Sequence, residues 1–273
     1  MKTIELFVKI KVDHLKSIIE RFINILCFEP QNMDVYYNEF KKMKYKIPYS
    51  ANVMNALSVS ELDGGITGLT LYPPKTADFN NTMDFRIHIY DTSFENGQVR
   101  CSFEWTAMHE VRNNYINGIL NLVIQEGIEL IYLLAYDYLD ANHEMERYNG
   151  LRKSSNPITD EDVWGRRELE NRTNFSFVAA PIMYYGKEYY SIVPQKALLS
   201  VSNSQVISIM GHEIISIKLF DINEPPSKHR EMQKAYWIST SLERCIMEYR
   251  KKQSFSAFEY FKQRAEKWQM RKR

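Results

Sequence analysis

One stretch, Asn174–Leu199, constrains the fold of this chain more than any other because it is the densest run of aromatic and β-branched residues. It reads NFSFVAAPIMYYGKEYYSIVPQKALL and is punctuated by Pro181, Gly186 and Pro194. A Tyr-Tyr pair lies on each side of Gly186, and glycine can adopt the positive φ that a hairpin turn usually needs. The pattern therefore predicts two strands that meet at a tight turn at Gly186.

The tyrosines of this predicted hairpin are candidate partner-binding residues. Successive side chains of a strand point to opposite faces of a sheet, so about half of them should be buried and half available to a partner. Tyrosine is enriched at interfaces because it offers a large rigid surface with a polar tip, and the chain has 18 tyrosines. The alternative is that they bridge the core and surface of a wide sheet. The four are Tyr184, Tyr185, Tyr189 and Tyr190.

Hydrophobic periodicity elsewhere predicts an α+β fold, with a mainly antiparallel sheet, helices packed on one face and two C-terminal helices. Asp13 is expected to cap the first helix. The long helix near the C-terminus is expected to bury Met232, Ala235, Tyr236, Ile238, Leu242, Ile246 and Tyr249. Strands are expected at 4–12, 67–72, 84–90, 99–106, 128–138, 205–210 and 213–220, and helices at 13–29, 35–43, 108–126, 159–170, 195–199, 228–252 and 255–270.

The composition changes at a polar segment, residues 140–172, which we interpret as a connection. It separates an N-terminal α+β half, residues 1–139, from residues 173–273, which should hold β-hairpins and two helices. A length of 273 residues suits two modest domains or one continuous domain.

The sequence carries no signature of catalysis, metal binding or a cofactor. Its six histidines are dispersed without a helical i, i+4 pair, and its three cysteines have no short spacing. Neither a nucleophile elbow nor a phosphate-binding loop is present. The N-terminus lacks a signal-peptide core and the apolar runs are shorter than the ~20 residues of a membrane span, so we expect a cytoplasmic protein with no membrane contact.

Charge is balanced along the whole chain, with 35 basic and 34 acidic residues, but it is locally uneven. Residues 137–170 form an acidic segment. It could bind a basic surface of a partner and speed association, or it could be a solvated face. The candidates are Asp137, Asp140, Glu144 and Glu146. From Arg244 onward, the chain has ten Lys or Arg residues and three Glu residues. This basic end motivates a second hypothesis, an enzyme acting on a nucleotide or nucleic acid, or a defence-system component.

Two stretches are similar to known proteins. Residues 181–194, with PIMYYGKEYY followed by Ile192-Val193-Pro194, and residues 217–221, ahead of the helix from Lys228, resemble parts of bacterial immunity proteins of polymorphic toxin systems. Those proteins often carry an M-Y-Y/F-G segment before a P-x-x-x-L turn. The resemblance covers about a quarter of the chain. It implies a non-enzymatic protein that binds and neutralises a cognate toxin, with nucleic acid as a less favoured partner.

Overall fold

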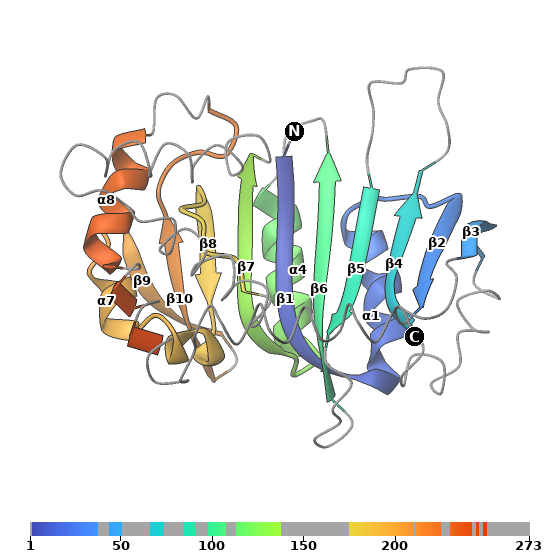
Figure 1. Ribbon diagram of the computed structural model, residues 1–273, viewed down its shortest axis with the longest axis horizontal. Helices are drawn as coiled ribbons and strands as arrows, with labels where there is room; N and C mark the ends of the chain where they lie inside the picture. The colour runs from blue at the N-terminus through green and yellow to red at the C-terminus, as the bar shows by residue number, and fades with distance from the viewer. Residues whose placement is uncertain are drawn as a thin grey trace, which may run out of the picture.

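The computed structural model describes residues 2–37, 44–50, 66–73, 84–90, 98–107, 113–137, 175–209, 211–224, 230–241, 244–245 and 248–249. Its strands form a ten-stranded sheet in the order β3-β2-β4-β5-β6-β1-β7-β8-β10-β9 (Figure 1). Every pair of neighbouring strands is antiparallel, which confirms the predicted α+β class and sheet type.

The strands are β1 (Lys2–Lys11), β2 (Asn32–Tyr37), β3 (Lys44–Pro48), β4 (Ile66–Tyr72), β5 (Asp84–Tyr90), β6 (Gln98–Ala107), β7 (Glu129–Asp137), β8 (Ile182–Tyr185), β9 (Ser204–Ile209) and β10 (His212–Lys218). The helices are α1 (Val12–Ile25), α4 (Asn113–Gln125), α7 (Gln195–Leu199) and α8 (Arg230–Thr240), with a 3₁₀ helix η1 at Lys187–Ser191.

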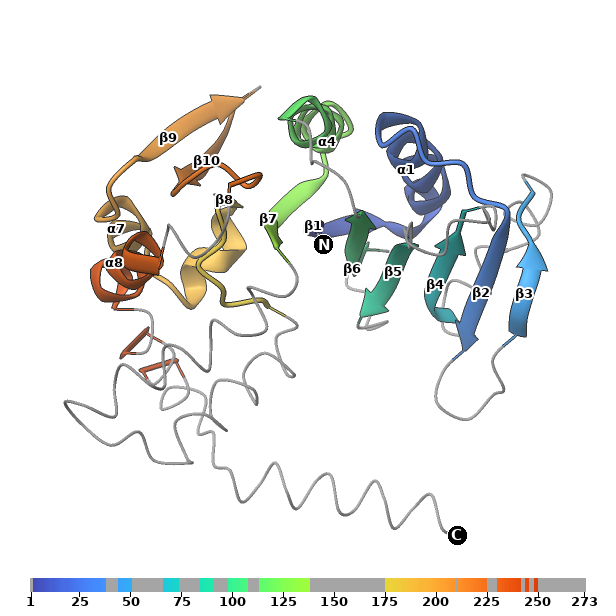
Figure 2. The same ribbon diagram turned by 90° about the horizontal axis from the view of Figure 1, so that it is seen from above.

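Strand β1 lies near the middle of the sheet because both of its edges are paired, with β6 on one side and β7 on the other. Its alternation places Ile4, Leu6, Val8 and Ile10 on one face, where all four are buried. Helices α1 and α4 cover this face and lie side by side across the sheet (Figure 2). The apolar residues of both helices and of this sheet face form the larger core.

A second apolar core lies on the opposite face, at the β7–β8–β10 end. Phe7 and Tyr132 meet the segment 175–180, η1 and α8 there. The sheet runs without interruption through the β7–β8 pair, where Leu134 lies opposite Met183. Strands from both sides of the polar connection therefore share one sheet, and the connection itself, residues 140–172, lies outside the described residues.

Most of the predicted strands and helices are present, but the start of the first helix was placed wrongly. Helix α1 begins at Val12, after an extended Lys11, and no side chain caps it. Asp13 lies in the first turn instead, where its negative charge is still favourable to the helix dipole.

The predicted helix at 35–43 is wrong over its first residues. Residues 32–37 form β2, in which Val35 lies opposite Leu69 of β4. Met33 and Val35 are buried in the core under α1, with the period of two that a strand has. This period is hard to recognise in the short, mixed sequence NMDVYY. Residues 38–43 lie outside the described part of the chain.

The predicted helix at 228–252 is not continuous, and its buried side was partly misassigned. Helix α8 stops at Thr240 because Ser241 has a left-handed φ of 45°. Within α8, Tyr236 is buried as expected, but Met232 and Ile238 are exposed and Gln233, Trp237 and Thr240 face the core. The predicted helices at 159–170 and 255–270 lie outside the described residues.

The predicted hairpin at Gly186 is also wrong. Strand β8 ends at Tyr185, and the next residues form η1 rather than a returning strand. Gly186 is extended, with φ −95°, so its conformation does not require glycine. Close packing requires glycine at this position instead, because a Cβ atom would lie 1.8 Å from the carbonyl oxygen of Leu130. The Gly186 N–H donates to the carbonyl of Ile131 at 2.9 Å, which extends the β7–β8 pairing by one bond.

Candidate functional site

Exposed apolar side chains gather at one end of the described structure. The large hydrophobic residues that are most exposed there are Leu199 (40%), Val206 (45%), Met232 (46%) and Ile238 (68%). They belong to α7, β9 and α8, and α7 contacts both of the others (Figure 1). Single exposed apolar residues are ordinary, whereas a contiguous apolar patch is typical of an interaction surface. We call these four residues the α7–β9–α8 surface.

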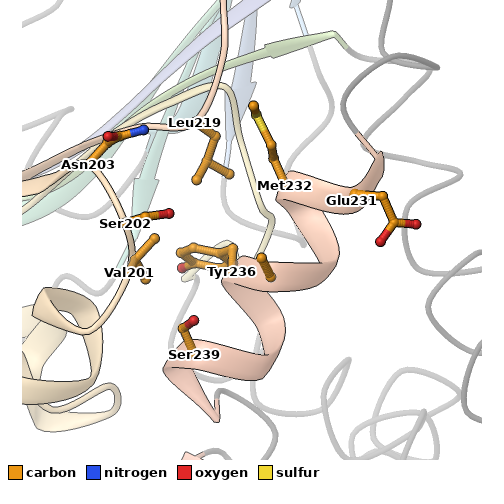
Figure 3. Close-up of a pocket in the computed structure, with 9 residues that line it drawn as sticks. Val201, Ser202, Asn203, Leu219, Glu231, Met232, Tyr236 and Ser239 are labelled. Carbon is orange, nitrogen blue, oxygen red and sulfur yellow. The ribbon is translucent and has the colours of Figure 1, made fainter.

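A pocket of about 210 Å³ opens beside this surface, between α8 and the turn Val201–Asn203 that leads into β9 (Figure 3). Tyr236 projects from α8 toward Val201, and Leu219 lines the same space from the sheet side. Met232 lines the pocket and is also one of the four residues of the α7–β9–α8 surface. The volume is below that of a usual small-molecule site, so it suits one inserted side chain better than a cofactor.

Hydrogen bonds hold the wall of the pocket in place. The Ser200 hydroxyl lies within hydrogen-bond distance of two carbonyl oxygens, that of Ala197 at 2.7 Å and that of Ser239 of α8 at 2.8 Å. The Ser204 hydroxyl donates to the carbonyl of Leu199 at 3.0 Å, and Asn203 adopts a left-handed φ of 65° that asparagine tolerates well. These bonds fix the relative positions of α7, α8 and the start of β9, so the pocket is preformed.

The four candidate tyrosines do not divide into a buried and an accessible half. Tyr184, Tyr185 and Tyr189 are buried, and Tyr190 is half-buried with its hydroxyl donating to the carbonyl of Tyr185 at 2.9 Å. Tyr184 and Tyr185 do point to opposite faces, because they belong to the two different cores. The expected accessible half is absent because the chain continues as η1, which folds Tyr189 back onto the sheet.

Tyr185 and Tyr189 lie in the core on which α8 packs. The Tyr185 and Tyr236 hydroxyls are 3.0 Å apart and hydrogen-bonded, and the Tyr185 and Tyr189 rings stack with centroids 4.3 Å apart. Burial, followed by the neighbouring Tyr236, raises the pKa of Tyr185 well above its usual range. Tyr185 is therefore a neutral donor or acceptor at any physiological pH, and it positions the helix that carries Met232 and Ile238.

Among the acidic candidates, the structure describes only Asp137. It is half-buried at the end of β7 and forms an ion pair with Lys2, whose Nζ is 3.5 Å from the carboxylate. It does not line the pocket. Asp140, Glu144 and Glu146 lie outside the described residues.

A second surface of interest is a polar row across the sheet, on the face opposite α1 and α4. The register aligns Thr70, Arg86, Glu104 and Glu5 on neighbouring strands. Arg86 donates to Asp84 at 2.5 and 2.9 Å, and its guanidinium lies 3.8 Å from the Glu104 carboxylate. Burial and then the Glu5 charge raise the pKa of Glu104 above its ordinary value.

The Glu5 carboxylate of this row is held by three hydroxyl donors. They are Tyr132 at 2.7 Å, Tyr136 at 3.0 Å and Ser176 at 2.8 Å. These contacts bind β1 and β7 to the segment 175–180. Within the described residues no group of three His, Cys, Asp or Glu side chains could hold a metal ion. Hydrogen bonds and an ion pair among the described residues thus connect the side chains of this row.

The α7–β9–α8 surface was missed in the sequence because its residues look like core residues. Met232 and Ile238 fit an apolar stripe at helical spacing. The predicted buried side of the helix therefore included them and not Trp237. The alternative phase through Gln233, Trp237 and Thr240 has a polar residue at two of three positions, so hydrophobicity alone selects against it. Val206 is exposed because β9 is the last strand of the sheet, which depends on long-range pairing.

Comparison with known proteins includes a distant structural likeness. No family model matches this chain, and no curated protein matches it. One solved structure, the Pseudomonas aeruginosa T6SS protein PA0821, is similar over 90% of this chain and 83% of its own, at 10% sequence identity and a TM-score of 0.45. At this distance neither function nor residue roles transfer. No helix within the described ranges is long and apolar enough to cross a membrane.

Proposed function

We propose that this chain is a non-enzymatic binding protein, an immunity protein that neutralises a cognate bacterial toxin by direct contact. The observation that carries the proposal is the α7–β9–α8 surface, where four exposed apolar side chains adjoin a preformed pocket. The resemblance of residues 181–194 to immunity proteins supports the same function. That segment includes β8 and η1, on which α8 packs.

The physical character of the surface favours a protein partner over a small molecule. Protein interfaces have an apolar centre with polar residues around it, and a few central side chains provide most of the binding energy. Met232 and Ile238 are suited to this central role because each keeps much of its area exposed on a helix held from beneath. Glu231 and Lys234 on the same helix form an exposed ion pair at 3.9 Å and would contribute to the polar surroundings.

A toxin-binding protein also needs a rigid scaffold, since affinity improves when little ordering is required on binding. Tyr185, Tyr189 and Tyr236 provide that rigidity, because they are fully buried and linked by stacking and a hydrogen bond. In this proposal two of the candidate tyrosines, Tyr185 and Tyr189, act by positioning α8 rather than by contacting the partner.

Co-expression tests the proposal. The protein encoded by the adjacent gene, taken as the candidate toxin, is expressed in cells with the wild-type chain, and we expect growth to be rescued. The double variant Met232→Glu, Ile238→Glu should fail to rescue, because two charges would be buried at an apolar interface. The matched control is Asn117→Glu, Asn121→Glu, which introduces the same charges at exposed positions of α4. Failure of the wild-type chain both to bind the candidate toxin and to rescue growth would refute the proposal.

A further inference from the structure

The two edges of the sheet differ in chemistry. Strand β3 at one edge ends in Pro48, and proline is a residue type that protects an edge from pairing with another chain. Strand β9 at the other edge reads SQVISI and carries no charge and no proline. It is six residues long and rich in β-branched side chains, so it has the composition of a strand that accepts a further strand.

Backbone geometry shows which groups β9 presents at its free edge. The N–H of Leu219 donates to the carbonyl of Pro181, toward β8. Backbone groups alternate sides along a strand, so Ser216 and Ile214 of β10 direct theirs toward β9. Their partners in the register are Gln205 and Ile207, which are therefore the residues of β9 bonded inward.

The remaining residues of β9 direct their backbone outward. Ser204 agrees with this assignment, because its N–H donates to the carbonyl of Val201 in the preceding turn and not to β10. By alternation, the N–H and C=O groups of Val206 and Ser208 point to the open edge. No described residue pairs with that edge, since β9 is the last strand in the sheet order.

The pocket lies on the same face of the sheet as the side chain of Val206. Val206 is opposite Ile215, which belongs to the core beneath α8. The wall of the pocket, Val201–Asn203, runs directly into Ser204 at the start of β9. A strand added along β9 would therefore pass the mouth of the pocket and could direct a side chain toward Met232 and Tyr236.

We propose that the edge of β9 binds an extended, uncharged segment of the partner protein, which adds to the sheet as an eleventh strand and inserts one apolar side chain into the pocket. Main-chain hydrogen bonds to Val206 and Ser208 would supply affinity, and the pocket would supply specificity. The segment is uncharged because β9 has no charged side chain with which a charge on the segment could form an ion pair. This inference rests on the proposed function, since it describes how the partner is bound.

A peptide selection tests the inference without any toxin. Short random peptides displayed on phage are selected against the full-length chain, and a synthetic peptide of the enriched sequence is titrated by fluorescence anisotropy. We expect enriched sequences that are uncharged, β-branched and anchored by one apolar residue. Ser208→Pro removes an outward N–H, and Ala235→Trp fills the pocket that Ala235 lines. Each should weaken binding roughly tenfold, as expected for losing one hydrogen bond or one buried side chain.

Matched controls separate these effects from misfolding. Ser208→Ala keeps the N–H, and Asn117→Trp adds the same ring at an exposed position of α4, outside the pocket and the α7–β9–α8 surface; both should bind the peptide as the wild type does. The inference is overturned if no sequence is enriched, or if the peptide binds Ser208→Pro and Ala235→Trp as tightly as the wild type. It is also overturned if the chain dimerises and Ser208→Pro makes it monomeric, because the occupant is then a second copy. Failure of toxin neutralisation would leave the peptide result unchanged.

Discussion

Substitution of Gly186 by alanine is expected to be among the most damaging single changes in the described part of the chain. The added Cβ atom would lie 1.8 Å from the Leu130 carbonyl oxygen and 2.8 Å from its carbon, whereas real Cβ contacts are essentially never under 3.0 Å. The backbone must therefore move by more than 1 Å. Both colliding atoms are main-chain atoms of β7, so no side-chain rotation relieves the clash.

The cost has two parts. Overpacking of this kind costs about 1–3 kcal/mol, and loss of the Gly186 to Ile131 hydrogen bond adds about 0.5–1.5 kcal/mol. We expect Gly186→Ala to lower the free energy of unfolding by about 2–4 kcal/mol. The assay is urea unfolding followed by far-ultraviolet circular dichroism, with the slope unchanged and the midpoint reduced.

Gly127→Ala is the matched control. Gly127 has a left-handed φ of 62°, and nothing lies within 4 Å of its added Cβ. Its substitution should cost about 1 kcal/mol through backbone strain alone. If Gly186→Ala costs no more than Gly127→Ala, the close approach of β8 to β7 is not the reason for glycine at position 186, and the packing argument fails.

Three further predictions follow from the same contacts. Tyr185→Phe removes a hydrogen-bond partner of Tyr236 and should lower the free energy of unfolding by about 1–2 kcal/mol, and in a double-mutant cycle Tyr236→Phe should then cost less than it does alone. Because burial raises the pKa of Glu104, the folded chain binds its proton more tightly than the unfolded chain does. Wild-type stability relative to Glu104→Gln should therefore fall as pH rises above the ordinary glutamate pKa of about 4, and a constant difference in urea midpoint would contradict this. The Met232→Glu, Ile238→Glu variant should unfold within about 0.5 kcal/mol of the wild type, since both side chains are exposed, and a larger loss would mean that they stabilise the fold.

Local sequence patterns predicted the antiparallel meander of β4, β5 and β6 and the placement of α4. Asp84–Tyr90 shows why, because its strict alternation matches a strand with one buried face. Gly127 follows the end of α4 and Gly211 lies between β9 and β10, and both have the positive φ that glycine favours. In such places the local signal and the tertiary environment agree.

The errors occurred where long-range contacts decide the structure. Gly186 has the sequence context of a hairpin turn, but its role depends on Leu130, more than fifty residues away in the chain. Likewise the helix phase of α8 depends on Trp237 packing into the core beneath the sheet. The α7–β9–α8 surface could not be predicted either, since it exists only because β9 is an edge strand beside α8.

Hydrogen exchange of the complex tests the central claim most directly. The full-length chain is mixed with the candidate toxin, and amide protection is compared with that of the free chain by mass spectrometry. The account predicts new protection in residues 195–209 and 230–240, which carry the α7–β9–α8 surface. Protection confined to β5 and β6, on the polar row across the sheet, with no change in α7, β9 or α8, would contradict it.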